Sequence, residues 1–152
     1  MKPLLIFLLT VSCARAEADQ GRLCLALVGF SESSGEPDTG VAEAMYVVLE
    51  RLKFPQMGWG DSICDVVNKK GQFVGVENFK YPRRPEAIDA KEWQRDLDMA
   101  DKVIAGTAPR DPKCKGATHF DQGGNKEGLV KLCRIGGHTF YIEKTNVEMA
   151  RK

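Results

Sequence analysis

Cysteines constrain the fold of this 152-residue chain more tightly than any other residue type. Cys13 lies in an apolar N-terminal stretch, and the other four follow at Cys24, Cys64, Cys114 and Cys133. An even number of cysteines in an exported chain predicts two disulfides. Four cysteines allow three pairings, which the sequence does not decide, and we favour Cys24–Cys64 with Cys114–Cys133 because each bridge joins neighbouring segments. A zinc site is the alternative, although the sequence has no Cys-x-x-Cys pair.

The first sixteen residues indicate that the chain is exported. The sequence MKPLLIFLLTVSCARA begins with Lys2, is apolar from Leu4 to Val11 and ends in Ala14-Arg15-Ala16. A charged start, a short apolar core and an Ala-x-Ala end are typical of secretory signal peptides. We therefore expect a signal peptide at residues 1–16, cleaved after Ala16.

The remaining residues, 17–152, are enough for one domain. Cleavage removes Lys2 and Arg15 and changes the formal net charge from +1 to −1. A near-neutral surface lacks the positive field that attracts nucleic acids, so we expect no nucleic-acid partner. We expect a periplasmic or secreted monomer that meets a membrane only through its N-terminal signal. The alternatives are an uncleaved anchor and lipidation at Cys13, but the apolar run is shorter than the about 20 residues of an ordinary membrane span.

Helical and strand patterns follow one another along residues 17–152. Four segments have the apolar spacing or the capping residues of helices, namely residues 20–31, 39–53, 61–68 and 85–106. Two short β-like runs come later, at residues 117–120 and 138–143, with a Gly- and Asn-containing loop at 121–128 between them. We therefore expect an α+β domain of about four helices and a small antiparallel sheet.

Two glutamates stand at the end of the first predicted helix, in the stretch GFSESSGEP at residues 29–37. Glu32 would face the negative end of the helix dipole and pack beside Phe30, and both effects disfavour a charged carboxylate. A carboxyl group that keeps its proton near neutral pH is what a general acid requires. Glu36 falls in the next turn and is expected to be more solvated. The alternative is that both are ordinary surface residues, as most glutamates are.

Five segments in order resemble a known family. They are SESSGEP, VAEAMYVVLERLKFP, DSICDVVNKKGQF, ATHF and IGGHTFYI, and together they cover residues 22–143. Their order and spacing resemble the cell wall hydrolases typified by spore cortex-lytic enzymes. The resemblance implies a compact α+β fold related to the lysozyme-like lytic transglycosylases. It also implies cleavage of the β-1,4 bond between N-acetylmuramic acid and N-acetylglucosamine in peptidoglycan glycan strands, without a metal or organic cofactor.

The same resemblance assigns roles to the two glutamates. The family's catalytic glutamate lies in a motif of the form A-E-A-R-G-E, which corresponds to residues 31–36 here. The first glutamate of the motif corresponds to Glu32, which becomes the expected catalytic residue. Glu36 matches the second glutamate, for which a structural or supporting role is expected. Serines replace both alanines and the arginine of the motif, at Ser31, Ser33 and Ser34.

The number of carboxylates separates two mechanisms. A glycosidase that hydrolyses its substrate normally needs two of them, one on each side of the bond. The resemblance implies the lytic transglycosylase route, in which one acid protonates the leaving oxygen and the C6 hydroxyl of the muramic acid attacks to form a 1,6-anhydro sugar. Asp121, after the ATHF run, is the candidate second carboxylate of a hydrolysing N-acetylmuramidase. A turn residue before Gly123-Gly124 is its alternative role.

Five further residues are candidates for substrate binding. Gln72 and Phe73 stand in KKGQF, which is similar to a G-Q-F in the family's cleft loop. An amide can hydrogen-bond N-acetyl and hydroxyl groups, and an aromatic ring offers an apolar face to a sugar. A capped loop and a core position are the alternatives for these two. The resemblance favours a cleft position for His119, with Phe120 or Tyr141 near it.

The two histidines, His119 and His138, invite a metal hypothesis. Together with Asp121 they would form a His/His/Asp set on two neighbouring strands. We favour instead one buried, hydrogen-bonded imidazole and one imidazole at a strand end, so no metal is expected.

The sequence therefore predicts an exported enzyme that acts on peptidoglycan, either in bacterial cell wall remodelling or in phage endolysin-type lysis of a host. A function of another class stays open. It is a secreted binding or inhibitor domain, held by disulfides, that has kept this fold without activity.

Overall fold

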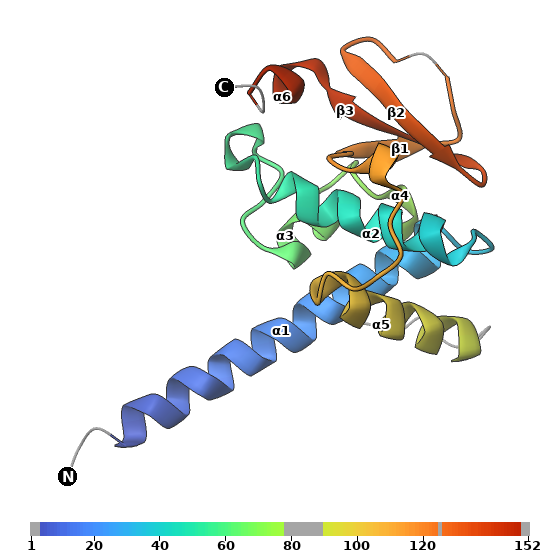
Figure 1. The fold of residues 1–152 in the computed structure, drawn as a ribbon. Coiled ribbons are helices and arrows are strands. Elements are labelled where there is room, and N and C mark those ends of the chain that lie inside the picture. The colour runs from blue at the N-terminus through green and yellow to red at the C-terminus, as the bar shows by residue number, and fades with distance from the viewer. Residues whose placement is uncertain (1–3, 78–89, 125, 150–152) are drawn as a thin grey trace.

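The computed structural model describes residues 4–77, 90–124 and 126–149 and confirms an α+β fold. The helices are α1 (Leu4–Glu32), α2 (Asp38–Arg51), α3 (Ile63–Asn68), α4 (Val74–Glu77), α5 (Ala90–Ile104) and α6 (Lys144–Met149). Short 3₁₀ turns cover Pro55–Met57 and Pro112–Cys114. The strands are β1 (His119–Asp121), β2 (Leu129–Ile135) and β3 (His138–Glu143). Figure 1 shows three layers, with α2 between the sheet on one side and α1 with α5 on the other.

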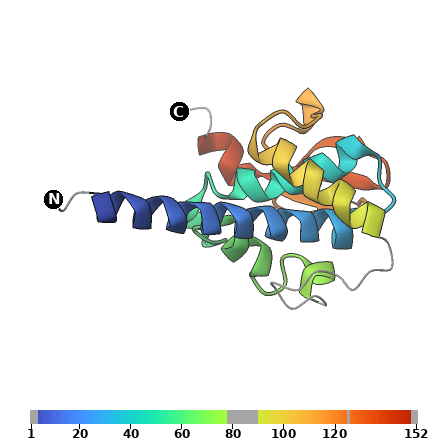
Figure 2. The ribbon, with the colours of Figure 1, turned by 90° about the horizontal axis from the view of Figure 1, so that it is seen from below.

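The first helix is longer than the sequence predicted. The predicted helix at 20–31 is the last part of α1, which begins at Leu4 and also includes most of the expected signal peptide. Figures 1 and 2 show the N-terminal part of α1 projecting away from the other elements, while its C-terminal part lies beside α5. There Leu25 and Val28 are fully buried. In the described part of the chain, no helix combines the length and the apolar character that a membrane span needs.

Helix α2 is buried almost all round, because it has a layer on each side. Val41 and Met45 pack into the larger core with α1 and α5, whereas Val47 packs with Phe140 of β3. The residue at the cap position is Pro37, and it makes no side-chain hydrogen bond to the helix.

The sheet is antiparallel with the strand order β1-β3-β2. Strand β2 was not predicted from the sequence. Its alternation of buried and exposed side chains is interrupted by an irregularity between Lys131 and Cys133. The first predicted strand, 117–120, lies two residues later, at His119–Asp121. Phe120 pairs with Phe140 in the register of β1 and β3.

The small helices show where local signals were sufficient. The predicted helix at 61–68 is α3, and Ser62 caps it in a capping box with Asp65. Helices α4 and α6 were not predicted, because four and six residues are too few to show a helical period. The predicted helix at 85–106 corresponds to α5, although its expected start at Pro85 lies outside the described residues.

Both favoured disulfides form. Cys24–Cys64 joins α1 to α3 with a Cα–Cα distance of 5.4 Å, and Cys114–Cys133 joins the second 3₁₀ turn to β2 at 5.2 Å. Each bridge stabilises the fold by about 2–4 kcal/mol, mainly because it restricts the unfolded chain. The zinc alternative is wrong, since all four cysteines are bonded in pairs.

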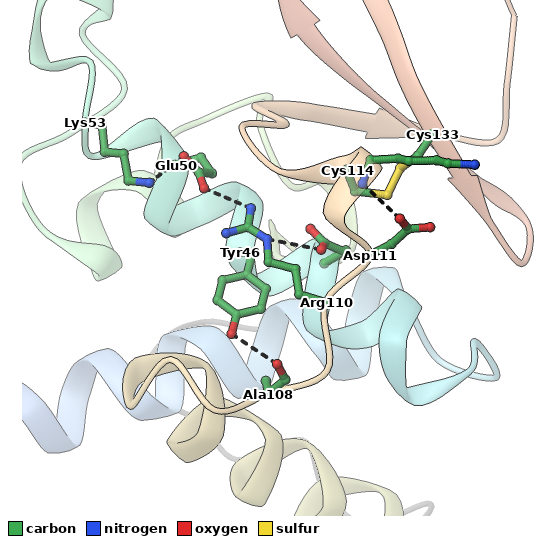
Figure 3. A network of polar contacts seen from close by, with 10 residues as sticks. Tyr46, Glu50, Lys53, Ala108, Arg110, Asp111, Cys114 and Cys133 are labelled. Atoms are coloured by element: carbon green, nitrogen blue, oxygen red, sulfur yellow. Dashed lines mark hydrogen bonds and ion pairs between the residues drawn. A yellow bond between two sulfur atoms is a disulfide. The ribbon is translucent and has the colours of Figure 1, made fainter. Parts of the chain in front are cut away.

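A polar network ties the segment after α5 to the outer side of α2 (Figure 3). The Arg110 guanidinium donates to Glu43 at 3.2 Å and to Glu50 at 2.8 Å, and it lies 4.3 Å from the centre of the Tyr46 ring. Burial raises the pKa of Glu43 to about 7, because the loss of water outweighs the charge of Arg110. Burial acts the same way on Glu50, but hydrogen bonds from Lys53 and Arg110 outweigh it and lower its pKa.

We predict that Glu43 makes folding less favourable as pH rises. Its folded pKa of about 7 exceeds the ordinary 4.5, so its contribution to stability is complete below pH 4.5 and is lost as pH rises through 7. Glu43→Gln removes this dependence. Between pH 5 and pH 8 the variant should gain up to about 3 kcal/mol in free energy of unfolding relative to the unmodified protein.

Urea unfolding of both proteins at several pH values measures this difference. Glu50→Gln is the matched control, because the pKa of Glu50 is lowered and its contribution is kept above pH 4.5. This control should gain nothing over the same pH range. Parallel stability curves for Glu43→Gln and the unmodified protein would show that the hypothesis is wrong.

Candidate active site

An open cleft of about 580 Å³ lies where the ends of α1 and α2, the α3–α4 loop, β1 and the start of β3 meet. Five predicted site residues line it, and these are Glu32, Gln72, His119, Phe120 and Asp121. Another hollow, between α1 and α3, is lined by Glu17, Asp61 and Ser62 and contains none of the predicted catalytic or substrate-binding residues. The larger part of the predicted site is therefore gathered in one place.

Glu32 is the last residue of α1 and is held by the start of α4. Its Oε1 accepts hydrogen bonds from the backbone N–H groups of Gly75 at 2.6 Å and Val76 at 3.3 Å. Within the described ranges, no hydrogen bond reaches its Oε2. These two backbone donors orient the carboxyl group, and no local pattern in the sequence indicated them. The role of Glu32 as an acid stays a prediction.

Gly75 lets α4 approach the end of α1 this closely. A Cβ atom at this position would lie 2.6 Å from the Ser31 carbonyl oxygen and 2.9 Å from Oε1 of Glu32. Contacts below 3.0 Å to backbone force the chain to move. The orientation of the Glu32 carboxyl group therefore depends on the absence of a side chain at residue 75.

Asp121 faces the same cleft, but its oxygens are already engaged. Oδ1 accepts from the Gly123 N–H at 2.8 Å and from the Tyr141 hydroxyl at 3.1 Å, and Oδ2 pairs with Lys126. Burial alone would raise the pKa of Asp121, but its bonds to Lys126, Gly123 and Tyr141 lower it. Asp121 is thus both a turn residue and part of the cleft wall.

The two histidines have different surroundings. His119 lies edge-on to Trp59 at 5.8 Å, and its Nδ1 is 3.0 Å from the Thr118 hydroxyl. Burial, with the charges of Arg51 and Lys126, lowers the pKa of His119 to about 4. It is neutral near pH 7, so its 3.6 Å approach to Glu143 is not an ion pair.

His138 also lines the cleft, with its ring 5.2 Å from Phe120. In the part of the chain that the structure describes, its Nδ1 is buried and has no hydrogen-bond partner. Over the same residues, no group of three or more histidine, cysteine, aspartate or glutamate side chains is placed to hold a metal ion.

Arg51 is a cleft residue that the sequence analysis missed. It ends α2, and its Nε donates to the Thr118 carbonyl oxygen at 2.8 Å. Burial lowers the pKa of Arg51 to about 10, which leaves it charged at neutral pH. The available signal was its place at the end of an apolar helix, in a segment that also carried the family resemblance.

A family model described as Cell Wall Hydrolase matches residues 35–141, well over half of the chain. The chain belongs to the cell wall hydrolase family. The match includes Gln72 and Asp121 and begins three residues after Glu32. No curated protein and no solved structure matches the chain. The family and the two disulfides fit an extracellular protein.

In this cell wall hydrolase, Glu36 lies outside the cleft. Both of its carboxylate oxygens accept from the Gly137 N–H at 3.1 Å, and a Cβ on Gly136 would overlap its Oε2. Its Oε1 lies 4.0 Å from Nδ1 of His138. Glu36 therefore fastens the β2–β3 turn to the α1–α2 turn, beside a residue that does line the cleft.

Two other predicted residues, Phe73 and Tyr141, contact residues that line the cleft. Phe73 is 2% exposed and packs 6.3 Å from Phe120, and Tyr141 is also 2% exposed. The Tyr141 hydroxyl donates to Asp121 and, at 2.8 Å, to the Gly124 carbonyl oxygen. Neither residue lines the cleft of this cell wall hydrolase, so any contribution from them to binding acts through Phe120 and Asp121.

We predict that Gly75→Ala displaces the Glu32 carboxyl group and impairs the enzyme. A shift of about 1 Å in a catalytic group can cost about 100-fold in rate, and a loss of this order is expected in a cell wall turbidity assay. Gly21→Ala is the control, because that glycine is also helical, in α1, but its added Cβ would meet only the Ile63 side chain. Equal activity of the two variants would contradict the assignment.

Proposed function

We propose that this cell wall hydrolase cleaves peptidoglycan glycan strands between N-acetylmuramic acid and N-acetylglucosamine, as a lytic transglycosylase that uses Glu32. The observation that carries the proposal is the position of Glu32, which lines an open cleft and is oriented by the N–H groups of Gly75 and Val76. Membership of the family supports a cell wall substrate.

The proposed reaction needs one carboxyl group and no water. Glu32 donates its proton to O4 of the departing N-acetylglucosamine as the bond to C1 of the muramic acid breaks. The C6 hydroxyl of the same muramic acid then attacks C1, and Glu32 takes up the hydroxyl proton. The products are a 1,6-anhydro-muramic end and a free 4-hydroxyl, and the carboxyl group returns to its starting state.

The state of Asp121 favours this route over hydrolysis. A second carboxylate that attacks the sugar or activates water needs an available oxygen. Both oxygens of Asp121 are occupied, one by Gly123 and Tyr141 and the other by Lys126. An N-acetylmuramidase that hydrolyses with both Glu32 and Asp121 is the second candidate, because Asp121 does line the cleft.

Two other residues of the cleft wall carry groups that suit a glycan. Gln72 offers an amide donor and acceptor for N-acetyl and hydroxyl groups, and Val74, which is 67% exposed, offers an apolar face.

We further propose that residues 1–16 act as an export signal, since the family and the disulfides fit a protein that works outside the cell.

Glu32→Gln should abolish lysis of purified peptidoglycan, because the amide cannot donate the proton. The amide oxygen can still accept from Gly75, so the melting temperature should change little. Mass spectrometry of the muropeptides released by the unmodified enzyme should show 1,6-anhydro-muramic ends.

Each outcome of this test separates the proposal from an alternative. Reducing ends would identify a hydrolysing muramidase instead. Unchanged lysis by Glu32→Gln would remove Glu32 from the mechanism, and no lysis by the unmodified protein would favour the binding-domain alternative.

Asp121→Asn distinguishes the one-carboxylate mechanism from the two-carboxylate one. A transglycosylase should keep activity within about tenfold, whereas loss of a nucleophile or base would cost about 1,000-fold or more. Tyr141→Phe is the matched control, since it removes one hydrogen bond to Asp121 and leaves the carboxylate in place. Initial rates of muropeptide release measure both variants, and a loss confined to Asp121→Asn and above 1,000-fold would favour hydrolysis.

A further inference from the structure

Among the described residues, two arginines stack on aromatic rings, and their ion pairing differs. Arg110 contacts the Tyr46 ring and pairs with two carboxylates, Glu43 and Glu50. Arg51 is only 4% exposed, yet within the described residues no carboxylate oxygen lies within 4.0 Å of its guanidinium. Arg110 has the partners of a structural cation, whereas Arg51 does not.

Neighbouring groups hold the Arg51 guanidinium in one position. Its carbon lies 4.9 Å from the centre of the Phe73 ring and 5.4 Å from the centre of the Trp59 ring. Its Nε donates to the Thr118 carbonyl oxygen. Among the described residues, its Nη1 is buried without a hydrogen-bond partner. The orientation of the group is thus set, while part of its donor capacity is unused.

A buried charge without an oppositely charged partner destabilises the folded protein, and no carboxylate among the described residues pairs with Arg51. Removing a partner from a buried ion pair strongly destabilises a protein, because the remaining charge is uncompensated. Glu143 acts on Arg51 electrostatically but does not pair with it, and the aromatic rings compensate only in part. Arg51 also lines the cleft that contains Glu32, so a bound ligand can supply the missing acceptor.

We propose that Arg51 binds the lactyl carboxyl group of muramic acid, and so makes the cleft select muramic-acid strands over neutral N-acetylglucosamine polymers. The inference rests on the proposed function, because it assumes a glycan in this cleft. It makes Arg51 a specificity-determining residue, separate from the proton transfer of Glu32.

The chemistry of the two sugars supports this acceptor. N-acetylmuramic acid differs from N-acetylglucosamine only by the lactyl ether on O3, so any residue that distinguishes them must contact that group. A guanidinium presents a planar fork of N–H donors that matches a carboxylate. Where a stem peptide is attached, the lactyl carbonyl oxygen remains as an acceptor at the same place.

Binding to two tetrasaccharides tests the inference in the inactive Glu32→Gln full-length protein. One is the alternating N-acetylglucosamine–N-acetylmuramic acid tetrasaccharide with free lactyl carboxylates, and the other is chitotetraose, which has the same β-1,4 backbone. Calorimetry should show the muramic ligand binding about 10- to 100-fold more tightly, the range expected for a charged hydrogen-bonded pair. Adding Arg51→Gln should reduce this preference to within about twofold, mainly by weakening the muramic ligand.

Further variants separate the lost contact from a damaged fold. Arg51→Lys keeps the charge without the fork and should retain part of the preference. Arg110→Gln is the matched control, because it also removes a cation stacked on an aromatic ring, and it should leave the preference unchanged. If Arg51→Gln does not fold, the methyl ester of the muramic tetrasaccharide replaces it, and the ester should bind the Glu32→Gln protein about tenfold more weakly than the free acid.

The inference is overturned if the Glu32→Gln protein binds both tetrasaccharides equally, binds neither, or keeps its preference after Arg51→Gln. These outcomes are distinct from failure of the proposed function, which is read from the products of the unmodified enzyme. Anhydro-muramic products together with equal binding would remove only the role of Arg51. A muramic preference that depends on Arg51, in a protein without lytic activity, would remove only the catalytic proposal.

Discussion

The burial of α2 on both sides is the constraint on which the rest of the structure depends. One side packs through Val41 and Met45 against α1 and α5, and the other packs through Val47 against the sheet. Because α2 occupies the middle layer, it contributes residues to both apolar clusters. The cleft is lined by Arg51 at the C-terminal end of this helix, by the end of α1 and by β1 at the edge of the sheet.

A helix in such a position has little room for charge, yet α2 carries three buried charged residues, and these are Glu43, Glu50 and Arg51. Arg110, in the segment after α5, compensates the charge of the two glutamates. These ion pairs also fix that segment against α2 (Figure 3). Arg51 receives no such compensation among the described residues. One cation that contacts α2, Arg110, thus serves folding, and another that α2 itself carries, Arg51, is the one that we propose for substrate selection.

Local sequence patterns predicted much of the fold. The apolar spacing located α2 and α5, capping residue types located α3, and the favoured disulfide pairings form. The misses have physical reasons. Strand β2 has an irregularity that breaks the two-residue alternation, and α4 is a single turn, stabilised by what it contacts and not by its own period.

The candidate site was likewise predicted only in part from the sequence. Residue types and a motif in the sequence pointed to Glu32 and Asp121, and the structure places both on one cleft. The sequence did not show that Asp121 is engaged by Lys126, that Glu36 faces Gly137, or that Arg51 has no carboxylate partner among the described residues. Such facts depend on segments that are distant in the chain, for example residues 36 and 137, and no local pattern encodes those contacts.

The sequence by itself determined the fold class, the disulfide-forming cysteines and the glutamate on which the catalytic proposal rests. These follow from short-range periodicity, capping chemistry and the identity of reactive side chains. Tertiary structure alone decided which carboxylate has an oxygen available, which glycine lets α4 approach Glu32, and which buried arginine lacks a carboxylate partner among the described residues. Those properties are set by burial and by hydrogen bonds between segments, which exist only after α1, α2 and the sheet have packed together.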